Sequence, residues 1–387
     1  MKLITEGLAK ISIKTSNKVS KDMDVFYNPV MKLNRDISVL LLNSINKKNM
    51  QISLPLAGSG IRGIRFLKEL NKGIIKSISF NDCSKKAVNS IKNSLSLNKI
   101  NNFKVIKKNN NISNKNNHDK KISIHNEDAN LFLLNSTGFD YIDIDPFGSS
   151  NPYLESAVKR LSRNGILAVT NTDTAALSGT YPNACIRNYW AVPKRDYMMH
   201  ETGLRILVRK IQLVAMQHDK ALFPIFSYFK DHYFRIFFQC IKGKKETDKI
   251  PKQHGMFNNA GPLWTGNLWD DKLVNKMHSE LLKKSIENKK TIKNNKTTIN
   301  KKINDNQNHN DILKFLKTIK EESKINTIGF YGIHDIAKKR KIKIISKKED
   351  IIKKIRKKGY KAASTHFSGT GIRSDIAYNK LISLLKE

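Results

Sequence analysis

Over residues 1 to about 243, short apolar runs alternate with helix-like patterns, and this alternation limits the fold more than any other feature. Strand-like runs lie at Ile52–Leu56, Ser77–Asn81, Lys121–His125, Tyr141–Asp145 and Ile166–Thr170. The patterns of Lys85–Leu97 and Pro152–Leu161 predict intervening helices. Such alternation is typical of an α/β fold, with a parallel sheet covered by helices on both faces. Two later runs, Phe223–Phe229 and Tyr233–Cys240, predict an antiparallel strand pair.

The first strand-to-helix turn is rich in glycine. Gly58, Gly60 and Gly63 have the spacing GxGxxG, which lets the backbone approach a ligand closely. A tight turn also needs glycine for steric reasons, so the motif alone is weak evidence. Asp82 ends the next strand, where a carboxylate can accept hydrogen bonds from both ribose hydroxyls. Together these residues favour a cofactor that contains adenosine, and both NAD and S-adenosylmethionine satisfy them.

Two further motifs distinguish these cofactors. Glu127-Asp128-Ala129 follows the third strand, where an acid can accept the adenine amino group. Asp145-Pro146-Phe147 follows the fourth strand, at the edge where open α/β sheets bind ligands. A carboxylate and the proline carbonyl can accept the two hydrogens of a purine amine, which localises its lone pair toward a methyl sulfonium. Phe147 can stack on the base. A strand-end turn capped by aspartate is the structural alternative, and a hydride-transfer enzyme has no use for the motif.

The charge balance bears on the partner. Lys and Arg number 71 against 33 Asp and Glu, giving a formal charge of +38. This surplus favours a polyanion such as nucleic acid, although Lys, Asn and Ile fill the loops as a codon bias would produce. The three cysteines form no CxxC, so we expect no metal site. No apolar leader or membrane-spanning stretch is present, which predicts a soluble, cytoplasmic protein without membrane attachment.

The composition changes after Gly243, which predicts two domains, residues 1–243 and 244–387. Lys283–Asp311 is a Lys/Asn tract that is interpreted as a solvated helix, a linker or a partly disordered segment. Lys347–Gly359 places Ile351, Ile352 and Ile355 on one helical face and lysines on the other. Asn109–Lys120 is a low-complexity insertion, for which we expect a mobile surface loop.

With these motifs the sequence resembles the tRNA guanine-26 N2-dimethyltransferases, particularly the archaeal type. The resemblance runs nearly end to end. The matching blocks are Val25–Ser38, Gly58–Glu69, Asn81–Val88, Asn126–Asn130, Asp143–Ser150, Asn171–Arg187, His200–Val208, Lys230–Phe237, Gly261–Asp270 and Thr365–Asp375.

The resemblance implies a class I, Rossmann-like methyltransferase domain joined to a smaller C-terminal α/β domain that binds tRNA. It implies transfer of two methyl groups in turn from S-adenosyl-L-methionine to the exocyclic N2 of guanine 26. No obligatory protein partner is inferred. The residues implied to bind the cofactor are Arg35, Arg62, Asp82, Asp128 and Ala129. Asp145 is implied to be the catalytic carboxylate, and Phe26 and Phe147 are the candidates to sandwich the flipped guanine, with core packing as the alternative for Phe26.

Two departures from the family pattern stand out. The segment after Gly148 reads SSNPY, where the family usually has Ser-Pro directly. Many relatives also carry a cysteine cluster before the Gly261 block, but Ile241–Ala260 contains no cysteine, so that possible metal site is not transferred.

Other polar residues have weaker assignments. His200 and His232 are interpreted as structural or close to RNA, and Asp173 as a substrate contact or a loop cap. Cys185 and Cys240 are expected to be buried apolar residues. Basic residues of the second domain are expected to contact phosphates, namely the Lys338–Lys343 run, the lysines of Lys347–Lys358 and Arg373. An NAD-dependent oxidoreductase and a non-enzymatic RNA-binding protein are the alternatives from other functional classes.

Overall fold

The computed structural model describes residues 2–13, 25–106, 121–294 and 299–386, and the predicted insertion Asn109–Lys120 lies outside them. The chain forms two compact units. The first comprises residues 1–172, 211–223 and 235–250, and the second comprises residues 173–210, 224–234 and 251–387. The predicted functional division at residue 243 stays a prediction.

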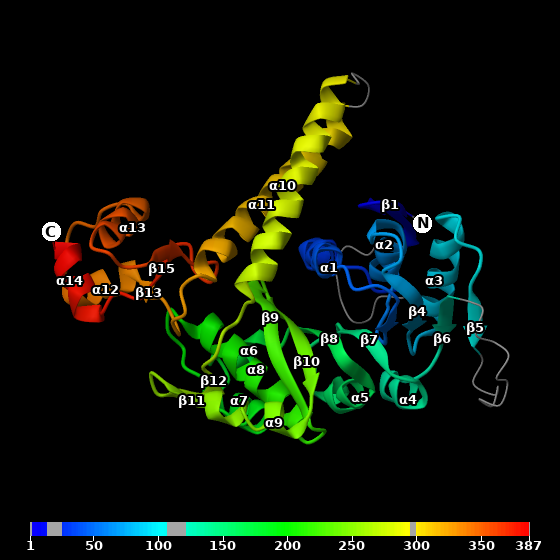
Figure 1. Ribbon diagram of the computed structural model, residues 1–387, viewed down its shortest axis with the longest axis horizontal. Coiled ribbons are helices and arrows are strands. Elements are labelled where there is room, and N and C mark those ends of the chain that lie inside the picture. The colour runs from blue at the N-terminus through cyan, green and yellow to red at the C-terminus, as the bar shows by residue number, and fades with distance from the viewer. Residues whose placement is uncertain (1, 14–24, 107–120, 295–298, 387) are drawn as a thin grey trace. The chain divides into compact units, whose positions relative to one another are not determined.

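An eight-stranded sheet has the strand order β5-β6-β4-β3-β7-β8-β10-β9 (Figure 1). In that order the strands are β5 (Lys104–Ile106), β6 (Ile122–His125), β4 (Ile75–Asn81), β3 (Met50–Leu54), β7 (Phe139–Ile144), β8 (Leu161–Asn171), β10 (Tyr233–Lys242) and β9 (Lys220–Lys230). The pairs from β5 to β8 are all parallel. Two residues join β9 to β10, so these strands form a hairpin and run antiparallel. The predicted strands and the late hairpin are therefore confirmed.

Helices cover both faces of this sheet. The helix α1 (Lys32–Ile45) precedes the first strand of the sheet, and those that follow its early strands are α2 (Ile61–Glu69), α3 (Lys85–Leu97), α4 (Ala129–Asn135) and α5 (Leu154–Arg160). α2 contacts α1 and α3, whereas α4 contacts α5, and Figure 1 shows the two groups on opposite faces. Strands covered on both faces are expected to be apolar throughout, and β7 and β8 are almost continuously buried. The N-terminal hairpin of β1 (Lys2–Glu6) and β2 (Ala9–Ile13) packs against α2 and α3.

The topology fixes where a ligand can bind. The chain continues from β3 to β4 on one side, while β7 pairs with β3 on the other, so the strand order reverses between β3 and β7. Open α/β sheets bind ligands outside the carboxyl ends of their strands at such a reversal. The residues that follow β3, β4, β6 and β7 therefore meet at one edge of the sheet.

The second unit contains short elements and one long helical pair. Its shorter elements before residue 271 are α6 (Thr174–Leu177), α7 (Pro182–Tyr189), β11 (His254–Phe257) and β12 (Ala260–Trp264). The helix α8 (Met199–Met216) contributes residues to both units, and α9 (Lys244–Thr247) belongs to the first. The helices α10 (Asp271–Asn294) and α11 (Ile299–Glu322) run side by side (Figure 1). Most of the Lys/Asn tract is thus helical, and residues 295–298 lie outside the described residues.

The C-terminal lobe, residues 331–386, has its own small core. It consists of the sheet β13-β15-β14 and three helices, with β13 (Tyr331–Gly332), β14 (Ala362–Ser364), β15 (Gly371–Ser374), α12 (Ile333–Arg340), α13 (Lys348–Lys357) and α14 (Tyr378–Lys386). As predicted, α13 buries Ile351, Ile352 and Ile355 in this core. The lobe is therefore α/β, although the periodicity after Ile312 indicates helix only.

A closed ion network lies in the core of the second unit. The guanidinium of Arg373 is fully buried and pairs with Glu201 at 2.5 Å and with Glu322 at 3.0 Å. Its remaining donors reach the carbonyl oxygens of Thr327 and Gly329 at 2.7 and 2.8 Å. The expectation that Arg373 contacts phosphates is wrong, because a side chain enclosed in this way cannot reach solvent.

Candidate active site

The glycine-rich turn follows β3 and leads into α2. Gly58 and Gly60 have φ values of 52° and 75°, a region that L side chains rarely adopt. Gly63 has a different role, since a Cβ there would lie 2.2 Å from the Phe80 ring on β4. The first two glycines thus shape the turn, and the third lets α2 pack closely against the sheet, as in dinucleotide-binding folds.

Asp82, Asp128 and Ala129 line the same edge of the sheet. The carboxylate of Asp82 accepts hydrogen bonds from the backbone of Gly58 at 2.9 Å and of Ser84 at 3.0 Å. Asp128 caps α4, and Ala129 is the first, buried residue of that helix. Each carboxylate therefore also shapes its loop. An ionised carboxylate has about four acceptor sites, so both retain capacity to accept hydrogen bonds from a ligand.

Asp145 follows β7 directly, and its side chain is 24% exposed. Nη2 of Arg62, on α2, pairs with Oδ2 of Asp145. Nη1 of Arg62 donates to Asn34 and Ser38, both at 2.9 Å. Arg62, which the resemblance implies to bind the cofactor, thus holds Asp145, which it implies to be the catalytic carboxylate.

A buried cluster lies behind this pair. Arg235, on β10, is fully buried and binds both oxygens of Asp143 at 2.8 and 2.9 Å. Tyr141 donates to Asp143 at 2.5 Å, and Arg62 lies 3.5 Å from it. Burial by itself would raise the pKa of Asp143, but the charges of Arg235 and Arg62 hold it below its usual value. Asp143 is therefore buried and ionised, and it holds the guanidinium groups of Arg235 and Arg62 in place.

Arg35 is fixed by a second ion cluster. Its guanidinium donates to both oxygens of Glu6, at 2.7 and 2.6 Å, and to the carbonyl of Asn28 at 3.0 Å. Burial favours a higher pKa for Glu6, but Arg35 and Arg65 outweigh it and lower that pKa to about 2. The charge of Arg35 is thus largely compensated within the protein.

Two aromatic rings border the site. The ring centroids of Phe26 and Phe147 lie 4.1 Å apart with an interplanar angle of 67°. Phe147 is 48% exposed, which is unusual for an apolar side chain of this size. Core packing does not account for Phe26 fully, because its side chain also lines a cavity of about 50 Å³. Arg35, Arg62, Gly58 and Asp145 line the same cavity.

The structure thus brings the predicted residues to one edge of the first unit. Phe26, Arg35, Arg62 and Asp145 line the small cavity. Asp128 lines a separate cavity of about 650 Å³ next to β5 and α3. Sequence reasoning gave no role to Asp143 or Arg235. The signal that could have found Arg235 is its position among the apolar residues of a predicted buried strand.

The remaining polar residues have structural surroundings. His200 stacks on Phe229, with ring centroids 3.8 Å apart, and burial lowers its pKa. Asp173 accepts a hydrogen bond from the hydroxyl of Tyr189 at 2.8 Å. Cys185 and Cys240 are buried, as predicted. His232 is exposed at the β9–β10 turn.

Among the residues that the structure describes, no group of three or more His, Cys, Asp or Glu side chains could hold a metal ion. None of the helices, as far as the chain is described, is long and apolar enough to cross a membrane.

Comparison with known proteins defines the class. The solved structure of Trm1 from Pyrococcus horikoshii in complex with S-adenosyl-L-methionine matches with a TM-score of 0.81 and 34% identity, covering 100% of both chains. This likeness and the sheet order confirm the predicted fold, a Rossmann-like methyltransferase domain with an additional C-terminal domain.

The family model of N2,N2-dimethylguanosine tRNA methyltransferase matches residues 7–259 and 251–386. The chain belongs to this family. The tRNA (guanine(26)-N(2)/guanine(27)-N(2))-dimethyltransferase of Aquifex aeolicus is 35% identical, covering 100% of this chain and 96% of that protein. The tRNA (guanine(26)-N(2))-dimethyltransferase of Methanocaldococcus jannaschii is also 35% identical, covering 99% of this chain and 98% of that protein.

Proposed function

We propose that the chain transfers one and then a second methyl group from S-adenosyl-L-methionine to N2 of guanine 26 in tRNA, giving N2,N2-dimethylguanosine. The observation that carries this proposal is the cluster of Asp145, Phe26, Phe147 and the Gly58–Gly63 turn at one sheet edge, in a chain of this family. The predicted activity and cofactor agree with the names of the relatives that match the whole chain. We place the activity in the cytoplasm, where tRNA is available.

The residues at the sheet edge have the chemistry that this cofactor needs. Its ribose hydroxyls and adenine amine are hydrogen-bond donors, and Asp82 and Asp128 are acceptors on adjacent loops. The buried N–H of Ala129 lies at the start of α4, where a backbone donor suits the adenine ring. Arg35 and Arg62 both line the small cavity, and of the two Arg62 is the better partner for the methionine carboxylate, because Arg35 is already compensated by Glu6. The bound cofactor would supply an electrophilic methyl group.

Asp145 would accept a hydrogen bond from one N–H of the guanine amine and take up that proton as N2 gains the methyl group, with S-adenosylhomocysteine as the leaving product. Its Oδ2 is paired with Arg62, but a carboxylate has about four acceptor sites, so Oδ1 stays available to the base. A carboxylate on the bound cofactor offers Arg62 a further partner. Asp143 and Arg235 keep Arg62 close to the site, since they remain buried and paired.

Phe26 and Phe147 would hold the flipped base. Their planes are inclined by 67°, so one ring has to rotate before guanine can lie between parallel faces. Phe147 can turn at small cost because it is half exposed. Stacking on such rings offsets part of the cost of removing the base from its helix.

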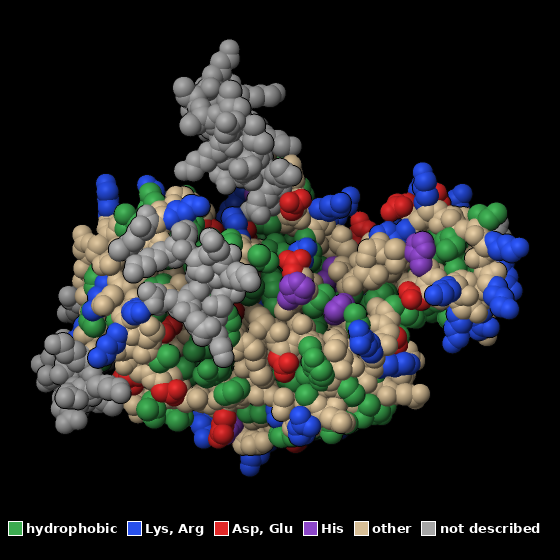
Figure 2. Space-filling model, turned by 180° about the vertical axis from the view of Figure 1, so that it is seen from behind, with side chains coloured by type: hydrophobic (Ala, Val, Ile, Leu, Met, Phe, Trp, Pro, Cys, Tyr) green, Lys and Arg blue, Asp and Glu red, His purple; other side chains and the backbone are tan. Residues whose placement is uncertain are grey.

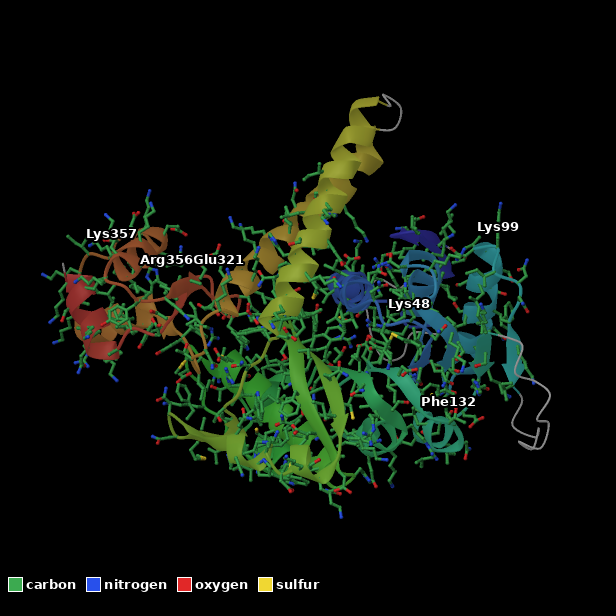
Figure 3. The ribbon with its side chains drawn as sticks, viewed as in Figure 1. Lys48, Lys99, Phe132, Glu321, Arg356 and Lys357 are labelled. Carbon is green, nitrogen blue, oxygen red and sulfur yellow. The ribbon has the colours of Figure 1, made fainter. Side chains whose placement is uncertain are left out.

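The C-terminal domain, residues 244–387, is proposed to hold the tRNA. Figure 2 shows Lys and Arg side chains gathered on the C-terminal lobe. We call two of its segments the basic face: the Lys338–Lys343 run, and Lys353, Lys354, Lys357 and Lys358 on and just after α13. Arg356 on the same helix is engaged instead with Glu321, at 3.5 Å (Figure 3). Lysines on one surface can grip phosphates by charge and shape.

Product analysis tests the reaction. The protein is incubated with undermethylated tRNA and labelled S-adenosyl-L-methionine, and the digested nucleosides are identified. We expect N2-methylguanosine first and N2,N2-dimethylguanosine later, and no label in a tRNA whose guanine 26 is replaced by adenine. Binding of NADH without binding of S-adenosylhomocysteine would instead favour the oxidoreductase, and RNA binding without transfer would favour a non-enzymatic protein.

Salt-dependent binding tests the basic face. Replacing Lys353, Lys354, Lys357 and Lys358 with Ala should weaken tRNA binding and flatten its dependence on salt, because each phosphate neutralised contributes about 0.7 to 0.9 to the log–log slope. Affinity for S-adenosyl-L-methionine should not change. Wild-type tRNA affinity and salt slope in the quadruple variant would show that these lysines are merely solvated.

A further inference from the structure

A cavity in the second unit is lined by residues other than those assigned to methyl transfer. It has a volume of about 790 Å³, within the range of small-ligand pockets. Residues from the segment before α8, from β11, from residues 327–331 and from α12 form its walls. None of the candidate site residues lines it.

Aromatic rings form much of the wall. Tyr197 contacts Phe330 edge to face, with centroids 5.8 Å apart, and Tyr331 lies 6.3 Å from Tyr378. Phe330 is buried, whereas the three tyrosines are partly exposed. Burial and nearby acids, Asp196 first, raise the pKa of Tyr197 to about 12, so its ring stays neutral and its hydroxyl remains a donor. Such rings provide faces on which a planar group can stack.

Carboxylates stand beside these rings. Asp196 and Asp375 each use one oxygen to accept a backbone N–H, from Met198 and Lys361, both at 2.8 Å. Asp335, in the first turn of α12, is exposed, and within the described part of the chain it has no hydrogen-bond or ion-pair partner. The cavity therefore presents acceptor oxygens close to stacking surfaces.

The cavity also reaches the basic face. Lys339 lines it and belongs to the Lys338–Lys343 run. It is exposed, and no described residue pairs with its ammonium group. A phosphate held by this lysine would place the neighbouring base within reach of the rings and of Asp335.

We propose that this cavity binds an unpaired nucleotide of the RNA substrate whose base carries an exocyclic amino group. This inference rests on the proposed tRNA substrate and adds a second contact with it, distinct from the flipped guanine. RNA-binding proteins read single-stranded bases by stacking them on aromatic side chains and hydrogen-bonding their edges. Adenine, cytosine and guanine can donate an amino hydrogen to Asp335, whereas uracil has only one N3–H, which lies between two carbonyl oxygens that the carboxylate repels. The cavity should therefore discriminate against uridine.

Fluorescence of a short oligonucleotide tests this directly. The probe is a single-stranded RNA pentamer with 2-aminopurine at its centre, whose fluorescence falls when the base stacks. We expect the wild-type protein to quench it, and pentamers with a central adenosine or cytidine to compete at least five-fold better than one with uridine. Tyr197→Leu should reduce the quenching, and Asp335→Asn should bring the uridine pentamer close to the others, since an amide is both donor and acceptor.

Neighbouring residues supply matched controls. Lys338 is exposed on the same helix but does not line the cavity, so Lys338→Ala should weaken pentamer binding less than Lys339→Ala. Asp350→Asn on α13 should keep the preference against uridine. Affinity for S-adenosyl-L-methionine should be unchanged in every variant, and circular dichroism with urea unfolding verifies that the second unit of each variant folds.

The outcomes separate this inference from the proposed function. Absence of quenching, equal competition by uridine, or quenching insensitive to both Tyr197→Leu and Asp335→Asn would overturn the inference. If such a result accompanied normal methylation of guanine 26, the inference alone would fail. Failure of methylation would count against the proposed function, whatever the pentamers show.

Discussion

Two buried ion networks in this chain use the same chemistry to different ends. In the first unit, Asp143 pairs with Arg235 and lies 3.5 Å from Arg62, and in the second unit Arg373 joins Glu201 to Glu322. The pKa values of Asp143, Glu201 and Glu322 are lowered, because opposite charges outweigh burial. The first network continues through Arg62 to Asp145, which is partly exposed, whereas the second ends on buried backbone carbonyls.

This difference distinguishes a network that positions a residue for a ligand from one that only stabilises the fold. A network with one exposed member can fix that member for a ligand, while a network that satisfies itself can only fasten the elements that carry it. Here the fastened elements are α8, α11 and β15. Breaking the first network should therefore affect the reaction, and breaking the second should affect stability alone.

The largest effect is expected at the exposed end of the first network. Asp145→Ala should lower the methyl-transfer rate by about 10²- to 10⁴-fold, the usual contribution of a positioned proton acceptor. Calorimetry should find S-adenosyl-L-methionine binding largely retained. A variant with near-normal turnover would show that Asp145 is only a strand-end cap.

Arg235→Met tests the buried end of the same network. Removing one partner of a buried ion pair costs about 3–5 kcal/mol of the free energy of unfolding, because the remaining charge stays buried. We also expect turnover to fall at saturating cofactor, since Arg62 would be drawn from Asp145 toward Asp143. Urea unfolding and turnover by the folded fraction measure the two effects. Unchanged turnover per folded molecule would separate this network from the reaction.

Arg373→Met is the matched change in the second network. It leaves Glu201 and Glu322 buried without their shared partner, so a stability loss of about 3–5 kcal/mol is again expected. Turnover per folded molecule and affinity for S-adenosyl-L-methionine should stay within two-fold of wild type. A large fall in turnover by fully folded protein would contradict the contrast between the networks.

Acid should weaken the second network through Glu322. The charges of His366 and Arg373 outweigh burial and lower its pKa to about 2, from an ordinary value of 4.5. A lowered carboxylate pKa stabilises the fold above the ordinary value, and this contribution is lost as pH falls from about 4.5 toward 2. It amounts to about 3 kcal/mol. In urea unfolding between pH 6 and pH 3, Glu322→Gln should have a flatter pH dependence than wild type, and equal slopes would refute this assignment.

The sequence predicts the sheet well because its strands are local apolar runs. The exact start and end of α3, Lys85–Leu97, follow from a capping serine and a regular pattern. The ion networks could not be predicted in the same way. Arg373 follows a glycine-rich segment like that of a phosphate site, and only the packing of α8 and α11 around it shows that it is enclosed. Likewise, Arg62 and Asp145 are 83 residues apart, and their pairing depends on the reversal of strand order between β3 and β7.

The packing of Gly63 has a consequence for how such chains are recognised across evolution. Because its missing Cβ makes room for the Phe80 ring, selection for a folded sheet is sufficient to preserve this glycine. A descendant that had lost every trace of catalysis would still keep the last glycine of GxGxxG. The presence of Gly63 therefore indicates common ancestry and a common fold. The presence of Asp145, which the core does not require, indicates instead that the descendant is still a working enzyme.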